Sequence, residues 1–299
     1  MSDNAGQPTP GAPRWLATVN PVLLAAIAIG VLTGMDAVIK EASSRYPTLQ
    51  VAFLRFVFGA AITLAAVLVT RAGWPSFETV RANILRSVLV AATGVLFFYA
   101  LSVLPLADAI GVSFASPFFV VLFGALILGE RIDRRIGLAL GLGLLGMLVI
   151  LGGQIGRSAY SGAAWLGALA AVGSALTYAL SMVLLRARAQ RDALLFIVLM
   201  HSVGPALILA GPAALVWVKP ALSDYPLFVA MGLLGFAGHM GLGAAFARAE
   251  AARLAPVEYT ALVWGTAIGF LVFGELPGVL TVIGTALIVT GTVLNSRRR

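Results

Sequence analysis

Four charged residues, Asp36, Lys40, Arg55 and Asp108, lie within or at the edges of long apolar stretches of the chain. If these stretches cross a bilayer, charged side chains there are costly, and they usually pair with one another or line a pathway. The four residues could form an ionic network that closes one side of a pathway and separates when a solute is released. Alternatively, they could form a fixed ion pair that holds neighbouring helices together.

A second group of side chains could bind a small, ring-shaped and partly apolar molecule. His239 lies near the middle of its apolar stretch among several glycines, which we expect to leave room around it. A neutral imidazole could donate a hydrogen bond to a carboxylate or accept one from an amine. Aromatic walls with a few hydrogen-bond donors are typical of sites for such molecules. The other candidates for this site are Phe98, Tyr99, Pro117, Tyr178 and Trp264. The alternative for each candidate is packing against a neighbouring helix or lipid, and for His201 we expect packing.

No residue pattern in the chain predicts an enzyme, a metal site or a cofactor site. The chain has no cysteine, which excludes thiolate metal sites, disulfides and cysteine nucleophiles. It has no HExxH, no GxSxG and no pair of catalytic carboxylates within the apolar stretches. Residues 141–146 fit the GxGxxG pattern, but a dinucleotide site needs a strand before it and a helix start after it. These glycines lie inside an apolar stretch, so we interpret them as a surface for close helix packing.

The composition is that of a membrane protein. Hydrophobic residues make up 60% of the chain and charged residues 11%, and the mean hydropathy is +1.00, whereas a soluble protein has about 25% charged residues. Ten apolar stretches are long enough to cross a hydrocarbon core of about 30 Å, and the backbone of such a segment must satisfy its own hydrogen bonds as a helix. We therefore expect an all-α membrane protein with ten transmembrane helices, at roughly residues 20–39, 48–70, 84–103, 106–128, 136–153, 163–185, 193–217, 226–247, 256–274 and 278–294.

The positive residues indicate how these helices are oriented. If the N-terminus is cytoplasmic, fifteen of the twenty Lys and Arg residues, Arg86 among them, fall in segments on the cytoplasmic side. Four fall on the other side, and Arg55 lies within a span. Cytoplasmic loops are enriched in Lys and Arg, so both termini are expected to be cytoplasmic. This topology explains the net charge of +8, and we expect no binding to nucleic acid.

A short sequence occurs twice, 145 positions apart. Residues 124–130 read GALILGE and residues 269–275 read GFLVFGE, and a glycine follows each glutamate by sixteen positions, at Gly146 and Gly291. An odd number of spans separates the copies, so they must have opposite orientations in the membrane. Inverted repeats are typical of carriers that open alternately to each side. The alternative is a chance similarity of two glycine-rich helices. We expect a polar tail at 1–19, five-helix halves at 20–155 and 160–295, and a basic tail at 296–299.

These motifs resemble those of the drug/metabolite transporter superfamily, specifically its ten-helix members with two EamA-type halves. The resemblance rests on the two repeated motifs, on Pro117, and on residues 53–56, 99–101 and 246–248. Among such proteins the chain is most similar overall to bacterial inner-membrane exporters of aromatic amino acids. In the family, the first, third, fourth, sixth, eighth and ninth helices surround a central cavity. The chain departs from a symmetric pattern where Trp264 stands near the position equivalent to Pro117, so a kink shared by the two halves is in doubt.

The resemblance and the residues together predict a multi-pass carrier of the bacterial inner membrane that exports small amphipathic metabolites, aromatic amino acids above all, by alternating access. Its partners would be the bilayer and the small-molecule substrate, and a monomer or a homodimer would both be compatible with the sequence. The carboxylates of Asp36, Asp108, Glu250, Glu258 and Glu275 all fall near the ends of predicted spans. Since ion-coupled carriers have carboxylates at mid-depth, we expect transport without ion coupling. The alternatives are a proton-coupled exporter of other metabolites or drug-like compounds, and a non-transporting receptor or scaffold.

Overall fold

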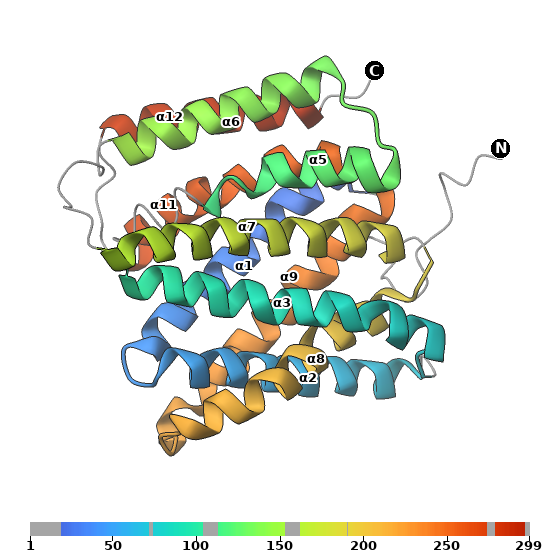
Figure 1. Ribbon diagram of the computed structural model, residues 1–299, viewed down its shortest axis with the longest axis vertical. Helices are drawn as coiled ribbons and strands as arrows, with labels where there is room; N and C mark the ends of the chain where they lie inside the picture. The colour runs from blue at the N-terminus through green and yellow to red at the C-terminus, as the bar shows by residue number, and fades with distance from the viewer. Residues whose placement is uncertain are drawn as a thin grey trace. The chain divides into compact units, whose positions relative to one another are not determined.

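The computed structural model describes residues 19–71, 74–103, 113–152, 162–189, 191–273 and 279–296, and all regular structure in these ranges is helical (Figure 1). Ten of the described helices have 13 residues or more: α1 (Pro21–Ser43), α2 (Thr48–Thr70), α3 (Phe77–Val103), α5 (Ser116–Leu128), α6 (Arg134–Gly152), α7 (Gly162–Ala189), α8 (Leu194–Leu215), α9 (Tyr225–Arg248), α11 (Thr260–Phe273) and α12 (Val279–Ser296). The shorter helical segments are η2 (Leu222–Asp224), α10 (Ala251–Leu254) and η3 (Ala255–Tyr259).

Six of the described helical segments are long and apolar enough to cross a membrane: Pro21–Ser43, Thr48–Thr70, Phe77–Phe97, Leu169–Ala189, Leu194–Leu215 and Leu222–Arg248. Helix α5 and the segment Val282–Leu294 of α12 are also apolar but shorter. Large apolar side chains such as Leu68, Leu126 and Leu271 are exposed, which suits a surface in lipid. The chain is therefore a multi-pass membrane protein.

Local signals explain where several helices begin and end. Oδ1 of Asn20 accepts a hydrogen bond from the backbone N–H of Val22 at 2.9 Å, and Pro21 follows at a position where its missing N–H costs nothing. Oδ1 of Asp133 caps the start of α6 in the same way. Gly129 ends α5 in the left-handed conformation, with φ of 67°, which a glycine adopts without strain.

The described helices form two compact units, and each unit combines two separate segments of the sequence. Unit 1 comprises Met1–Ala91 and Leu184–Ala249, and unit 2 comprises Ala92–Val183 and Glu250–Arg299. Helices α3 and α7 thus contribute to both units. None of the three boundaries falls between residues 155 and 160, where the sequence predicts the junction of two halves. Those halves remain a prediction.

Within unit 1, α2 packs against α8 and α9, and α1 packs against α9. Gln50, near the start of α2, contacts Val218, just beyond the end of α8, whereas Gly59 in the middle of α2 lies against Ser202. Because the order of contacts is reversed along the two helices, α2 and α8 run antiparallel. The apolar core of this unit includes Met35, Leu54, Phe228 and Met231.

Within unit 2, α6 and α12 lie side by side through small residues (Figure 1). A Cβ atom added to Gly146 would lie 2.6 Å from the carbonyl oxygen of Gly284, and one added to Gly291 would lie 3.2 Å from the carbonyl oxygen of Ala139. The two glycines sixteen positions beyond the repeated glutamates therefore allow the backbones of α6 and α12 to approach each other closely. These two helices also run antiparallel, since the early part of each contacts the late part of the other.

The helix bounds recur along the chain. The first residues of α6 and α12, Arg134 and Val279, are 145 positions apart, which is also the spacing of the two sequence motifs. At the same spacing, α2 corresponds to α8, α3 corresponds to η2 with α9, and α5 corresponds to α11, each to within one residue at either end.

Two details differ from the helices predicted by the sequence. The segment predicted at 256–274 begins earlier, at Ala251, and consists of α10, the 3₁₀ segment η3 and α11. Arg86 was predicted to lie in a cytoplasmic segment, but it is the tenth residue of α3 and is buried. Hydropathy alone placed the starts of both helical segments too late in the chain. Polar residues inside a helix lower the local hydropathy, so such a stretch resembles a loop when the partners of these residues are unknown.

Candidate functional site

A cluster of basic side chains lies inside unit 1. His201 of α8 and His239 of α9 have ring centroids 3.9 Å apart, with 35° between the ring planes. Nη2 of Arg86, on α3, lies 3.3 Å from Nδ1 of His201. Arg55 of α2 lies close enough to interact electrostatically with both histidines. We refer to Arg55, Arg86, His201 and His239 as the basic cluster.

The hydrogen bonds of the cluster define which nitrogen atoms can bind a ligand. A guanidinium group only donates, so Nδ1 of His201 accepts from Arg86 and Nε2 of a neutral His201 carries the hydrogen. Nδ1 of His239 donates to the carbonyl oxygen of Gly235 at 2.7 Å, which leaves its Nε2 as an acceptor. A second nitrogen of Arg86, Nη1, donates to the carbonyl oxygen of Ile197 at 3.4 Å.

Two buried donors of the cluster lack a partner among the described residues. They are Nε of Arg86 and Nε2 of His201, in residues that are 2% and 6% exposed. Leaving a buried donor unpaired costs about 1–3 kcal/mol. The arrangement therefore favours a ligand atom that accepts hydrogen bonds.

The charges of the cluster also favour an acceptor with negative charge. Asp36 of α1 interacts electrostatically with Arg55. Since the cluster contains two guanidinium groups, the single carboxylate of Asp36 leaves it with net positive charge. Guanidinium groups bind carboxylates and phosphates through charge-assisted hydrogen bonds.

Aromatic rings complete the surroundings of the cluster. The ring of Phe56 meets that of His201 edge to face at a centroid distance of 5.9 Å. The guanidinium carbon of Arg55 lies 4.6 Å from the centroid of the Phe56 ring, within the range of a cation–π contact. Apolar parts of a ligand would therefore also find partners beside these charges.

The glycines around His239 do not leave open space, contrary to the interpretation from the sequence. A Cβ atom added to Gly238 would lie 2.6 Å from the side chain of Leu32, and one added to Gly241 would lie 3.0 Å from Ala28. These glycines allow α1 to pack closely on α9. His201, for which packing was expected, instead stacks on His239 and binds Arg86.

The residues predicted to bind a substrate are distributed over both units. His239 belongs to unit 1, whereas Tyr99, Pro117, Tyr178 and Trp264 belong to unit 2. Tyr99 and Trp264 are exposed on α3 and α11. Pro117 stands in the first turn of α5, where a proline starts a helix and does not kink it. The side chain of Phe98 lies outside the described residues, as do the side chain of Lys40 and all of Asp108.

A carboxylate inside unit 2 was set aside by the sequence analysis. Glu258 lies in η3. Its Oε2 accepts a hydrogen bond from Oγ of Ser116 at 3.2 Å, and its carboxylate also accepts one from the hydroxyl of Tyr178. It is the eighth residue of the continuous helical segment from Ala251 to Phe273, so it lies within that segment and not at its end. The sequence predicted the start of this span at residue 256, which placed Glu258 near the end of the span. The helical segment begins earlier, at Ala251.

The repeated motif has a structural role in its first copy. The backbone N–H groups of Ala251 and Ala252 donate to Oε1 and Oε2 of Glu130, each at 2.9 Å. Glu130 therefore caps the start of α10, where a negative charge is favourable. A Cβ atom at Gly124 would lie 2.8 Å from Oε2 of Glu130, which explains the glycine. Glu275 of the second copy lies outside the described residues.

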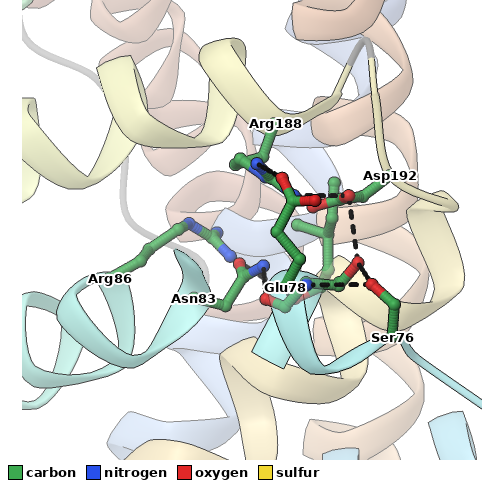
Figure 2. A network of polar contacts seen from close by, with 8 residues as sticks. Ser76, Glu78, Asn83, Arg86, Arg188 and Asp192 are labelled. Atoms are coloured by element: carbon green, nitrogen blue, oxygen red, sulfur yellow. Dashed lines mark hydrogen bonds and ion pairs between the residues drawn. The ribbon is translucent and has the colours of Figure 1, made fainter. Parts of the chain in front are cut away.

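A polar network holds the start of α3 against the α7–α8 connection (Figure 2). Arg188 donates from Nε and Nη2 to the two carboxylate oxygens of Asp192, both at 2.7 Å, and from Nη1 to Glu78 at 3.3 Å. Oγ1 of Thr79 donates to Oδ1 of Asp192 at 3.1 Å. Figure 2 shows Arg86 on the same helix as Glu78 and Asn83, so this network also positions Arg86. We refer to Glu78, Thr79, Arg188 and Asp192 as the α3 network.

A second polar contact joins the α1–α2 and α8–α9 connections. The hydroxyl of Tyr46 donates to Oδ2 of Asp224 at 2.7 Å, and Arg45 donates to Oδ1 at 2.7 Å. The hydrogen bond to Asp224 raises the pKa of Tyr46 above its ordinary value. Nε2 of Gln50 donates to the carbonyl oxygen of Val218 at 2.6 Å. The start of α2 is thereby held at the end of α8, while the α3 network holds the start of α8.

Among the described residues, no group of three or more His, Asp or Glu side chains gathers as a metal site. The residues that sequence reasoning missed are Arg86, His201 and Glu258. The sequence does show that each of them is a titratable side chain within or beside an apolar stretch. Only the contacts between helices distinguish such residues from residues of loops or from packing residues.

The family model that matches this chain and the named relatives are all of transporters. The model of the EamA-like transporter family matches residues 20–152 and again residues 165–297. A pseudopaline exporter of Pseudomonas aeruginosa is 34% identical over 287 residues, which cover 93% of this chain and 96% of the exporter.

Two further relatives are named for other compounds. An S-adenosylmethionine uptake transporter of Rickettsia prowazekii is 24% identical over 260 residues, 86% of each chain. A riboflavin transporter of Rhizobium johnstonii is 30% identical over 219 residues, 71% of this chain and 69% of the relative. A solved crystal structure matches with a TM-score of 0.81 and 25% identity, over 92% of this chain and 97% of the other.

Proposed function

The chain belongs to the EamA-like transporter family, and on this premise we propose that it carries a small, carboxylate-bearing metabolite across a bacterial inner membrane. As a member of this family it is a membrane transporter and not an enzyme. The observation that carries the choice of substrate is the basic cluster, in which Arg86 and His201 keep unpaired donors in a buried position.

A carboxylate would offset the charge of the cluster and could accept a hydrogen bond from one of the two unpaired donors, Nε of Arg86 or Nε2 of His201. A neutral compound could accept the same hydrogen bond but would leave the positive charge without a partner in a region of low dielectric constant. Phe56 and the two imidazole rings would then contact the apolar part of the solute.

Aromatic amino acids are one class of such solutes, but none of the relatives described above is named for them. Export of aromatic amino acids is therefore a narrower form of the proposal that the chain transports a carboxylate-bearing metabolite. The direction of transport is proposed as export, because the exporter is 34% identical to this chain and the uptake transporter 24%.

We further propose that ten helices cross the membrane as two inverted five-helix halves with cytoplasmic termini. The helix bounds that recur after 145 positions support two halves. The antiparallel pairs α2 with α8 and α6 with α12 support their inversion, since each pair joins equivalent helices. Alternating access would follow from this arrangement.

Uptake into liposomes that contain only this protein tests the substrate proposal. Labelled phenylalanine, tryptophan, S-adenosylmethionine and riboflavin would be offered one at a time with no ion gradient and with a pH gradient. We expect saturable uptake of a carboxylate compound, inhibited by unlabelled phenylalanine but not by phenylalaninamide, which has the same ring and amine without the carboxylate. Uptake of riboflavin alone, or equal inhibition by phenylalaninamide, would contradict recognition of a carboxylate.

A further inference from the structure

We propose that Glu258 is a proton-binding site that couples transport to a proton gradient. This inference rests on the proposed function, because coupling requires transport. It also reverses the expectation of uncoupled transport, which depended on all carboxylates lying near the ends of spans.

The position of Glu258 is the first argument. The helical segment from Ala251 to Phe273 is interrupted by η3, and Glu258 lies in this 3₁₀ portion, seven residues beyond the start. A rise of 1.5–2.0 Å per residue places it roughly 10–14 Å from the capped end. A carboxylate at this depth within a membrane helix indicates an ion or proton pathway.

The partners of Glu258 are the second argument. Hydroxyl groups of Ser116 and Tyr178 donate to its carboxylate. A hydroxyl can donate to a carboxylate and can also accept from a carboxylic acid. The same two side chains can therefore bind Glu258 in both protonation states.

The charges around Glu258 are the third argument. Helices α5, α6, α10, α11 and α12 pack against η3, and their charged residues are Arg134 and Arg135 at the start of α6 and Arg253 in α10. The titratable groups that interact with Glu258 are the phenols of Tyr178 and Tyr259. No guanidinium or ammonium group of the described residues interacts with the carboxylate of Glu258.

Four other described carboxylates contact a positively charged side chain or backbone N–H groups. Asp36 faces Arg55, Asp192 binds Arg188, Asp224 binds Arg45, and Glu130 accepts two backbone N–H groups. Opposite charges and N–H donors favour the ionised form of a carboxyl group. Glu258 differs because its partners are neutral hydroxyl groups, which can donate to the carboxylate and can also accept from the acid.

The proposed step is a simple proton exchange. The carboxylate of Glu258 takes one proton from water on the side where the proton concentration is higher, and the resulting acid returns that proton to water on the other side. No bond other than O–H forms or breaks, and no electron is transferred. Outward movement of the metabolite would accompany inward movement of the proton.

Infrared spectroscopy of the full-length protein in lipid nanodiscs tests proton binding without any substrate. The chain has 12 Asp and Glu residues, so the pH is lowered only over a range above about 6, in which exposed carboxyl groups with pKa values of about 4 stay ionised. In this range we expect the carbonyl band of a protonated carboxylic acid to appear in the wild-type protein and to be weaker in Glu258→Gln. Glu250→Gln is the matched control, because Glu250 is an exposed carboxylate just before α10 and should leave this band unchanged. An identical band in Glu258→Gln would overturn the proposal even if the protein proves to be a transporter.

Transport in liposomes tests coupling. With the labelled compound identified in the uptake screen, an imposed pH gradient should accelerate wild-type transport, and Glu258→Gln should lose this acceleration while it retains exchange of labelled for unlabelled compound. Glu258→Asp keeps a titratable group and should keep the acceleration, which guards against a variant that fails to fold. A wild-type protein that transports at the same rate with and without the gradient would refute coupling and leave the proposed function standing.

Discussion

Arg86 shows at the scale of one residue why a charge is retained inside a membrane protein. Its guanidinium group binds His201 and the carbonyl oxygen of Ile197, but Nε has no partner among the described residues. The cost of this burial is offset when an anionic ligand binds, so the residue should contribute to affinity more than to folding.

We therefore predict that Arg86→Gln raises the KM for the transported carboxylate about tenfold or more, because a hydrogen bond to a charged group contributes about 1.5–3 kcal/mol. Arg86→Lys should have an intermediate effect, since lysine keeps the charge but not the planar fork. Initial rates of uptake into liposomes over a range of substrate concentrations measure the change.

Arg81→Gln is the control for this measurement, because Arg81 lies on the same helix with an exposed side chain. Its KM should equal that of the wild type. If folded Arg86→Gln also keeps the wild-type KM, the basic cluster is not the substrate site.

At the scale of elements, connections between helices hold unit 1 together at two places. The α3 network binds the start of α3 to the α7–α8 connection, and Tyr46 with Asp224 binds the α1–α2 connection to α9. Both contacts use a nearly buried aspartate that accepts from an arginine and from a hydroxyl group. Such contacts determine where the basic cluster forms, because α3 and α8 carry Arg86 and His201.

Asp192→Asn should lower the free energy of unfolding by about 2–3 kcal/mol, because it leaves the largely buried Arg188 with only the exposed Glu78 as a counter-charge. Glu78→Gln should change it by less than about 1 kcal/mol, because the Glu78 side chain is 81% exposed and water screens its ion pair. Thermal unfolding in detergent, at matched protein and detergent concentrations, measures both. Equal shifts of the two midpoints would mean that burial does not determine the strength of this network.

At the scale of the whole molecule, the proposed topology can be tested because the chain has no cysteine. Single cysteines can be introduced at Ser44 and Ala221, in connections expected outside, and at Arg71 and Arg131, in connections expected inside. In intact cells a membrane-impermeant maleimide should label the first two variants. The other two should react only after the membrane is broken. Labelling of Arg131→Cys in intact cells would contradict cytoplasmic termini with ten spans.

Much of the architecture was predictable from the sequence, because the physical constraints of lipid act on each segment separately. A hydrocarbon core requires helices of a given length, so apolar stretches predicted the helices, although α3 begins seven residues earlier and α5 ten residues later than predicted. Glycines gave a second signal. The glycines of residues 141–146 indicated close packing, and the structure places Gly146 at the contact between α6 and α12.

The candidate site was less predictable, because it depends on contacts between residues far apart in the chain. His239 and Arg55 were chosen as polar residues inside spans, and the structure places both in the basic cluster. Arg86 was taken for a loop residue and His201 for a packing residue. Glu258 was predicted to lie at the end of a span because the hydropathy pattern did not indicate that the helical segment begins at Ala251. That start is stabilised by Glu130, a residue 121 positions earlier in the chain.

The sequence by itself thus determined the class of protein, the helical elements and the repeated motif, since composition and local periodicity are set by contact with lipid. Only the tertiary structure decided which polar residues meet. It stacked His201 on His239, placed Arg86 against them, and left Glu258 with two hydroxyl partners. The physical reason is that a charge inside a membrane is tolerated through its partners, and those partners come from helices whose packing no local pattern encodes.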